Sequence, residues 1–298
     1  GRTPARTVSG TVGGVVAANA SGPLRLGYGT PRDLLIGVTV VRADGKVARA
    51  GGKVVKNVAG YDLGKLFTGS YGTLGIITET VFRLHPLPTA AAYLTCPVSG
   101  PDEAHRQVQA VIHAQLAPVA VELDLPAPAG PGTVGLLLEG IGPGVEARTR
   151  QALAFLGEGA GESPEPPPWW GSYPFGTGDV ALRLTAEIAA LPHVLEVLGA
   201  AAAAHGVGCA VRGSAAVGVL HAGIPGDAEP AAVAGIVADL RTALARYDGT
   251  AVVLRAPEAL RSGLDPYGPV PALDLMRRVK DQFDPDHRLA PGRYVGGI

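Results

Sequence analysis

Residues 53–79 constrain the fold of this chain more than any other segment. Within them Gly69, Gly72 and Gly75 are spaced three residues apart and lead directly into an apolar run that is typical of a β-strand. Glycine is favoured where φ must be positive, or where another backbone or a ligand comes close. A second glycine-rich run covers residues 9–22. Together the two runs predict a backbone that closely approaches a flat or phosphorylated cofactor.

The composition narrows the class of protein. A chain of 298 residues is long enough for one large or two modest domains, and its 43 glycines and 26 prolines lie between apolar runs. This pattern indicates a folded, loop-rich α/β or α+β protein. The net charge of −1 without a basic cluster disfavours nucleic-acid binding, which requires grouped Lys and Arg. No apolar run reaches the about 18–20 residues of a membrane span.

The chain divides into three segments by its pattern. Residues 1–88 form one glycine-rich unit that ends at a His-Pro-Leu-Pro sequence, because closely spaced prolines terminate helices and central strands. Residues 89–256 alternate strands and helices, and the order β-α-β-β-α within them is typical of a ferredoxin-like unit with an antiparallel sheet. Residues 257–298 contain a predicted helix from Pro271 to Phe283 and a turn-rich tail. We expect this segment to dock back onto the first domain.

The glycine runs do not match the common phosphate-binding motifs. Gly10, Gly13 and Gly14 have the wrong spacing for a dinucleotide fingerprint, and residues 60–65 lack the spacing and the Ser or Thr of a P-loop. What remains is a Gly-Gly pair before a short predicted helix at residues 15–18. Its free N-terminal amides and its dipole could hold a phosphate, although a tight turn explains the pair equally well.

Metal and nucleophile chemistry has little support. No His or Cys residues occur at metal-ligand spacing, and no G-x-S-x-G sequence occurs, so we predict no metal site and leave the catalytic residues unassigned. Cys96 and Cys209 are far apart in apolar segments, which predicts buried, reduced thiols in a cytosolic protein.

Four segments together resemble the vanillyl-alcohol-oxidase superfamily, whose members bind FAD. Residues 10–22 (GTVGGVVAANASG) resemble its second cofactor loop, and residues 29–37 (GTPRDLLIG) its R-D-hydrophobic-G segment. Residues 55–63 (VKNVAGYDL) with 69–79 (GSYGTLGIITE) are similar to the D-2-hydroxyacid branch. The tail at 283–293 (FDPDHRLAPGR) resembles the terminal F-D-P…N-P-G-R.

Within that branch the chain is most similar to FAD-binding subunits of glycolate oxidases. The resemblance implies an α+β fold: the second half of a PCMH-type FAD-binding domain, a ferredoxin-like substrate domain, and a C-terminal segment returning to the FAD domain. It also implies noncovalent FAD and oxidation of a small 2-hydroxyacid such as glycolate to glyoxylate. The implied partners are a related flavin subunit and an iron–sulfur subunit. We expect a cytoplasmic protein that reaches the inner membrane only through these partners.

The resemblance also implies which residues approach FAD through their main chain. These are Thr11, Val12, Gly13, Gly14, Ser21, Gly22, Gly75 and Ile77. The first four would contact the pyrophosphate, the next two the ribityl chain or flavin edge, and the last two the adenosine or ring side.

Three departures from the family pattern qualify these expectations. The initial FAD subdomain would precede Gly1, and the chain has no starting Met, so we expect the natural start to lie upstream. The G-H-x-G-D-G-N-x-H sequence of catalytic relatives is replaced by residues 221–227 (HAGIPGD), which favours an accessory subunit. Ala290 stands where the tail usually has Asn.

Two alternatives remain open. A self-sufficient FAD-dependent D-lactate-type dehydrogenase would need a carboxylate clamp, for which Arg183, Arg212 and Arg255 are candidates, although each could form an ordinary salt bridge. A flavin-free scaffold subunit is suggested by Trp169 and Trp170, because aromatic residues are enriched at interfaces. Their loop could instead pack over the substrate domain.

Overall fold

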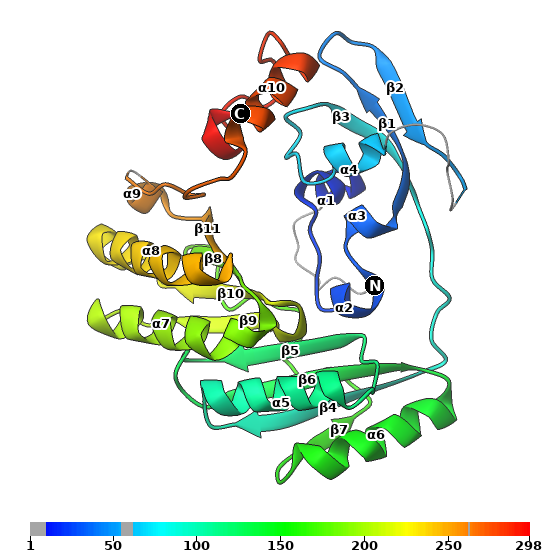
Figure 1. Ribbon diagram of the computed structural model, residues 1–298, viewed down its shortest axis with the longest axis vertical. Helices are drawn as coiled ribbons and strands as arrows, with labels where there is room; N and C mark the ends of the chain where they lie inside the picture. The colour runs from blue at the N-terminus through cyan, green and yellow to red at the C-terminus, as the bar shows by residue number, and fades with distance from the viewer. Residues whose placement is uncertain (1–9, 55–61, 262) are drawn as a thin grey trace. The chain divides into compact units, whose positions relative to one another are not determined.

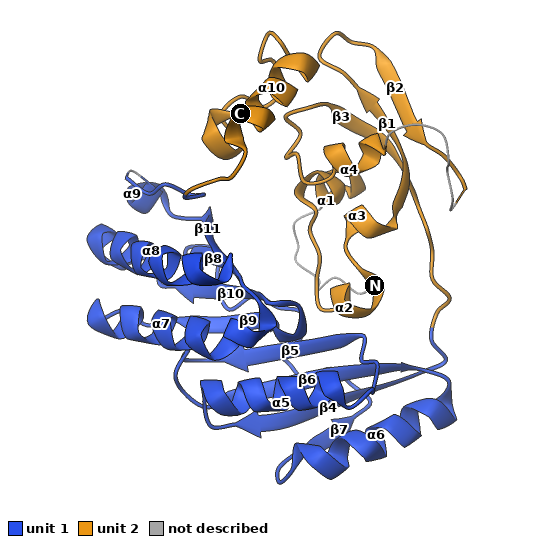
Figure 2. Cartoon of the chain, in the orientation of Figure 1, with its two compact units in different colours: residues 1, 3, 88–268 blue, residues 2, 4–87, 269–298 orange. Residues whose placement is uncertain are grey.

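The computed structural model of the chain describes residues 10–54, 62–261 and 263–298. The chain forms two compact units (Figure 2). Unit 1 is Pro88–Gly268. Unit 2 consists of two segments, the described residues before Pro88 and the C-terminal Pro269–Ile298. Most of the VKNVAGYDL motif lies outside the described residues. Whether the units are an FAD domain and a substrate domain stays a prediction.

Unit 1 is built on one eight-stranded antiparallel sheet in the order β11-β8-β10-β9-β5-β6-β4-β7 (Figure 1). Its first half consists of β4 (Ala90–Val98), α5 (Pro101–His113), β5 (Ala120–Leu125), β6 (Gly132–Gly140), α6 (Gly142–Leu156) and β7 (Gly161–Ser163). Its second half consists of β8 (Val180–Thr185), α7 (Leu191–Ala204), β9 (Ala210–Ser214), β10 (Val219–Ile224), α8 (Pro230–Leu244), β11 (Thr250–Arg255) and α9 (Glu258–Arg261).

The two halves of this sheet repeat one topology. Both β7-β4-β6-β5 and β11-β8-β10-β9 place their strands in the order fourth, first, third, second, which is that of a ferredoxin-like unit. The halves join through antiparallel pairing of β5 with β9, from Glu122 opposite Ser214 to Leu125 opposite Val211. The predicted ferredoxin-like, antiparallel α+β fold is confirmed.

The helices of unit 1 cover one face of its sheet (Figure 1). Side chains of a strand alternate between faces, so the fully buried Leu94, Leu123 and Leu136 share the helix-covered face. Tyr93 and Gly135 lie on the opposite face, which we call the open face. The register of the ladder places Glu122, Asp124, Arg183, Arg212, Ser214 and His221 on the open face as well.

Unit 2 is built on a three-stranded antiparallel sheet in the order β2-β1-β3. Its elements are α1 (Val12–Ala18), α2 (Arg25–Tyr28), α3 (Pro31–Leu34), β1 (Leu35–Val41), β2 (Val47–Gly51), α4 (Leu63–Phe67), β3 (Ile76–Phe82) and α10 (Leu273–Phe283). Its buried core is the cluster Val16, Leu35, Val38, Val40, Phe67 and Leu74. Val279 and Phe283 of α10 pack against this cluster, so residues near both ends of the chain share one core.

Two boundaries differ from those expected. Residues 257–268 belong to unit 1 and not to the C-terminal segment, because Val253 N donates to Pro266 O at 2.7 Å and Arg241 donates to Asp265 O at 2.8 Å. Helix α10 begins at Leu273, two residues later than expected, since Ala272 has a left-handed φ of 58°. Over the ranges that the structure describes, no helix combines the length and apolarity needed to cross a membrane.

Candidate functional site

Helix α1 begins at Val12, three residues earlier than the sequence pattern predicts, and includes the Gly-Gly pair. Thr11 caps it: the Gly14 amide donates to Thr11 Oγ1 at 3.0 Å. The Gly14 amide is thereby used within the helix. The amides of Val12 and Gly13 have no acceptor among the described residues. Of the four predicted pyrophosphate contacts, only the Gly14 amide is therefore already used by a described residue.

The start of α1 lies directly against β3. A Cβ added to Gly13 would lie 3.3 Å from Ile77 O, so a side chain there would press on the strand. On the same two elements Val12, Val15 and Ile76 remain 59%, 42% and 58% exposed. Free amides beside exposed apolar side chains fit a group that carries both phosphate and a flat apolar ring.

The glycines that lead into β3 serve the backbone itself. Gly69 and Gly72 have φ of 82° and 78°, values that L-residues rarely adopt. The turn that they form donates from Gly69 N to Val16 O at 3.0 Å and from Tyr71 N to Ala17 O at 2.8 Å. It therefore satisfies carbonyls at the C-terminal end of α1. The turn thus gives these two glycines a structural reason, and the expected contact of this segment with a ligand stays a prediction.

Gly75 and Ile77 both face the core of unit 2. A Cβ on Gly75 would lie 3.0 Å from Phe67 Cε1, and Ile77 is half-buried opposite Val40. Packing against Phe67 thus explains the glycine at position 75. A main-chain contact from either residue to FAD stays a prediction.

Ser21 and Gly22 lie in the loop between α1 and α2. Gly22 O accepts from Arg25 N at 3.1 Å, which begins the next turn. A Cβ on Gly22 would meet nothing within 4 Å, and its φ lies outside the left-handed region. Neither packing nor backbone conformation among the described residues explains why position 22 is a glycine.

The R-D-hydrophobic-G segment is also a local structural device. The Thr30 amide and hydroxyl both donate to Asp33 Oδ2 at 2.8 Å, which caps α3. These bonds lower the pKa of Asp33, the amide having the larger effect. The carboxylate is therefore engaged in ordering the chain entry into β1.

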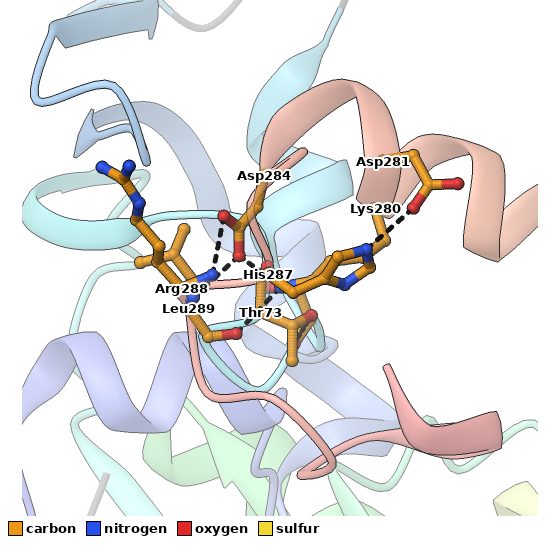
Figure 3. Close-up of polar contacts among 8 residues, drawn as sticks. Thr73, Lys280, Asp281, Asp284, His287, Arg288 and Leu289 are labelled. Atoms are coloured by element: carbon orange, nitrogen blue, oxygen red, sulfur yellow. Dashed lines mark hydrogen bonds and ion pairs between the residues drawn. The ribbon is translucent and has the colours of Figure 1, made fainter.

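The tail is held to unit 2 by a buried ion pair (Figure 3). Lys280 and Asp284 are 1% and 0% exposed, and Lys280 Nζ lies 2.6 Å from Asp284 Oδ2. The ammonium also donates to Thr73 O at 2.8 Å and to Leu289 O at 2.9 Å. All three Lys280 donors are satisfied, and one joins the tail to the loop before β3.

Asp284 is equally well bound. Its carboxylate accepts from the amides of Arg288 at 2.9 Å and Leu289 at 2.7 Å, as well as from Lys280. Burial alone would raise the pKa of Asp284, but these donors outweigh it and lower the pKa to about 2. We call this pair and its donors the tail clamp. Lys280 was not among the predicted site residues, although its spacing of four residues from the Asp of the F-D-P sequence was a usable signal.

The rest of the tail motif is likewise structural. Phe283 packs edge-on against Phe67 at 5.7 Å, and Tyr294 stacks on Tyr71 at 5.3 Å. Ala290 has a left-handed φ of 45°, a conformation that Asn tolerates better than Ala. The Asn expected at this position therefore has a conformational reason that needs no contact with a flavin.

In unit 1 the loop before β8 packs onto the open face of the sheet. A Cβ on Gly135 would lie 2.8 Å from Trp169 and 2.9 Å from Trp170, and Trp170 meets Tyr93 edge-on at 5.3 Å. Pro174 O likewise occupies the space of a side chain at Gly223. The two tryptophans therefore pack on the sheet of unit 1, which was the alternative prediction for this loop.

Two of the three candidate clamp arginines hold this loop. Arg212 binds Asp124 Oδ1 at 2.7 Å and donates to Ser172 Oγ at 2.6 Å. Arg255 donates to Gly176 O, and its guanidinium carbon lies 5.7 Å from the centre of the Phe175 ring. Arg183 differs: it has no hydrogen bond or ion pair with any described residue, and its solvent-inaccessible Nε has no partner.

The remaining polar residues give no metal site. No group of three or more His, Cys, Asp or Glu residues within the described ranges could hold a metal ion. Cys96 and Cys209 are buried and unpaired, as expected. Burial raises the pKa of the Cys209 thiol to about 12, which makes it unreactive.

Two protein families match segments of this chain. Residues 1–51 match the FAD binding domain, and residues 264–294 match the C-terminal domain of FAD linked oxidases. Most of the second segment belongs to unit 2, the unit that contains α1 and β3.

Curated relatives and a solved structure are also similar to this chain. The chain is 44% identical over 117 residues to glycolate oxidase subunit GlcD of Bacillus subtilis, covering 39% of this chain and 25% of the relative. It is 45% identical over 89 residues to glycolate oxidase subunit GlcE of Escherichia coli, covering 30% and 25%. An alkyldihydroxyacetonephosphate synthase structure has the same fold, with a TM-score of 0.62 at 17% identity over 93% of this chain and 57% of that one.

The chain thus spans about a quarter of the length of the curated relatives it matches. The matched segments identify FAD as the cofactor, and both segments are similar to domains of FAD-linked oxidases.

Proposed function

We propose that this chain is the FAD-binding subunit of a glycolate (D-2-hydroxyacid) oxidase or dehydrogenase complex. The observation that supports it most is that the two matched segments, from opposite ends of the sequence, meet in one compact unit. Val279 and Phe283 of the second segment pack against the core cluster that includes Val16 and Leu35 of the first. The substrate would be a small 2-hydroxyacid such as glycolate, oxidised to glyoxylate.

The residues of unit 2 would bind and orient the cofactor. The Val12 and Gly13 amides would hold the pyrophosphate at the start of α1, with Thr11 and Gly14 ordering that turn. Gly22 would let the backbone approach the ribityl chain or flavin edge, and Gly75 and Ile77 the adenosine or ring side. Bound noncovalently, FAD supplies the hydride acceptor; the chain supplies position and electrostatics.

The assembly is a further part of the proposal. The names of the GlcD and GlcE relatives are those of oxidase subunits, which supports a related flavin subunit as partner. Electrons would pass on to an iron–sulfur subunit, and the complex would lie in the cytoplasm, reaching the inner membrane only through its partners.

A self-sufficient D-lactate-type dehydrogenase is the second candidate, and the unpartnered Arg183 favours it because such an enzyme must bind a substrate carboxylate. Turnover of glycolate or D-lactate with an artificial acceptor by the purified chain alone would select this reading. The hypothesis of a flavin-free scaffold was suggested by Trp169 and Trp170. It has less support now, because both side chains pack against Gly135 of the unit 1 sheet.

The substitution Gly22→Ala tests the cofactor site without disturbing the fold. The added methyl meets no described atom, so thermal stability should be unchanged, whereas FAD affinity should fall by about tenfold or more if the backbone at position 22 lies against the flavin. Gly208→Ala in unit 1 is the matched control, because its Cβ also meets nothing within 4 Å. Fluorescence titration with FAD measures both. Equal affinity of the two variants and the parent would remove position 22 from the site, and absence of any flavin binding by the native protein would end the proposal.

A further inference from the structure

Arg183 occupies a position where a charged side chain without a partner is costly. It lies in the middle of β8 on the open face of the sheet, opposite His221 of β10 on one side and Val252 of β11 on the other. Its side chain is partly buried, and its Nε is closed to solvent without any acceptor. A buried donor left unsatisfied loses its hydration without replacement.

The acidic side chains near this region are already engaged. Asp124 binds Arg212 at 2.7 Å, and Glu122 accepts from Ser214 Oγ at 2.5 Å. Both lie on β5, three strands from β8 and therefore about 14 Å away at the usual strand spacing. Asp179, just before β8, accepts from the Gly176 amide at 2.6 Å. None of these carboxylates forms an ion pair with Arg183.

The surroundings of Arg183 add to its positive character. Arg255 is placed on the neighbouring strand opposite Ala181, two residues from Arg183, and its Nε is also buried without a partner. His221 separates Arg183 from Arg212 along the row of strands. Tyr173 lies edge-on against His221 at 4.9 Å, so an aromatic ring borders this row. The result is a row of guanidinium groups bordered by one aromatic ring.

We propose that Arg183 binds the carboxylate of a small anionic ligand, of the 2-hydroxyacid class, on the open face of the unit 1 sheet. A planar guanidinium offers paired donors that match a carboxylate, which would satisfy the donors that the fold leaves free. This assignment depends on the proposed function for the identity of the ligand, and not for the existence of the anion site. Arg212 and Arg255 hold the covering loop, and Arg183 makes the contact to the ligand.

The test is direct binding to the purified chain without flavin. Isothermal titration with glycolate and with D-lactate should give saturable binding that Arg183→Met weakens by about 10–100-fold, the loss expected for charge-assisted hydrogen bonds. Arg183→Lys keeps the charge but not the paired donors, so it should weaken binding by an intermediate factor. Arg106→Met, on the exposed side of α5, is the matched control and should bind as the parent does.

A second readout distinguishes a binding residue from a structural one. Without ligand, Arg183→Met should unfold at the same or a higher denaturant concentration than the parent, because it removes an unsatisfied group. Glycolate should then raise the midpoint of the parent but not that of the variant.

Several results would overturn the assignment. These are equal glycolate binding by parent and Arg183→Met, absence of binding by the parent, or a large loss of stability in Arg183→Met and Arg183→Lys alike. Tighter binding of inorganic phosphate than of glycolate would replace the carboxylate by a phosphate ligand and would also reject it. Because flavin is absent from these titrations, their failure is separable from failure of the Gly22→Ala experiment.

Discussion

Lys280 of unit 2 is a fully buried cation and Arg183 of unit 1 a partly buried one, and their surroundings are opposite. Lys280 is 1% exposed and has three acceptors, including the Asp284 carboxylate. Arg183 has none among the described residues. A fully satisfied buried pair is a property of the fold, whereas an unsatisfied donor lowers stability and needs a reason outside the fold. The number of acceptors therefore distinguishes Lys280, which stabilises the fold, from Arg183, which is a candidate binding group.

The largest expected effect follows from removing the clamp cation. Lys280→Met leaves Asp284 buried without its counter-ion and should destabilise unit 2 by about 3–5 kcal/mol. Amide hydrogen exchange across α10 and β3 should report the loss. Both tryptophans of the chain lie in unit 1, so their fluorescence transition should change little.

Lys46→Met is the control for this change, because the Lys46 side chain is 78% exposed and the substitution should stay within about 0.5 kcal/mol of the parent. The double variant Lys280→Met, Asp284→Leu removes both charges and should recover part of the stability. If Lys280→Met were as stable as the parent, the number of acceptors would not distinguish the two cations.

Acid should weaken the same clamp in a defined pH range. The pKa of Asp284 is about 2 in the folded chain against the usual 3.8 of an aspartate, so its stabilisation is present above about pH 4 and is lost as pH falls towards 2. A difference of nearly two units corresponds to about 2.5 kcal/mol. Urea unfolding of unit 2 at several pH values measures it. In Asp284→Asn this part of the pH dependence should disappear; an unchanged slope would assign it to other carboxylates, such as Asp33.

The fold was largely predictable because its determinants are local. Apolar alternation and turn residues identify β1 at Leu35–Val41, and proline with acidic residues identifies the start of α5. The joining of two ferredoxin-like halves through β5 and β9 was not predictable, since a strand sequence does not name its neighbour. The later start of α10 was not predictable either, because Ala usually favours helices and nothing in the sequence indicates the left-handed φ of Ala272.

The candidate site was predictable in part. The resemblance located α1 and the tail, and several of the residues that it assigned to the cofactor also have a structural reason, such as Gly75 beside Phe67. Glycine spacing alone cannot tell a ligand from a neighbouring backbone, because both exclude a Cβ. Of the three arginines proposed from charge, only their hydrogen-bond partners distinguish Arg183 from Arg212.

Arg212 and Arg183 lie on the same face of the unit 1 sheet but differ in their number of hydrogen-bond partners. Arg212→Met should destabilise unit 1 by about 2 kcal/mol, because it leaves the 15%-exposed Asp124 without its partner and releases the loop at Ser172. Arg183→Met should not destabilise it. Tryptophan fluorescence during urea unfolding measures both, since Trp169 lies below the Arg212 guanidinium at 6.0 Å. Equal losses in the two variants would show that partner number does not separate their roles.

The smallest expected effect concerns the backbone that the tail clamp fixes. Ala290 has a φ of 45°, where an L-residue with a Cβ is strained by about 1 kcal/mol and glycine is not. Ala290→Gly should therefore raise the stability of unit 2 by up to about 1 kcal/mol, although glycine also gains entropy in the unfolded chain. Ala238→Gly, inside α8, is the opposite control and should lower the stability of unit 1 by about 1 kcal/mol. Hydrogen exchange at Leu289 and Arg293 would follow the tail directly. If Ala290→Gly destabilised the tail, its conformation would be set by contacts of the Ala290 methyl group, and the conformational reason given for Asn at this position would be wrong.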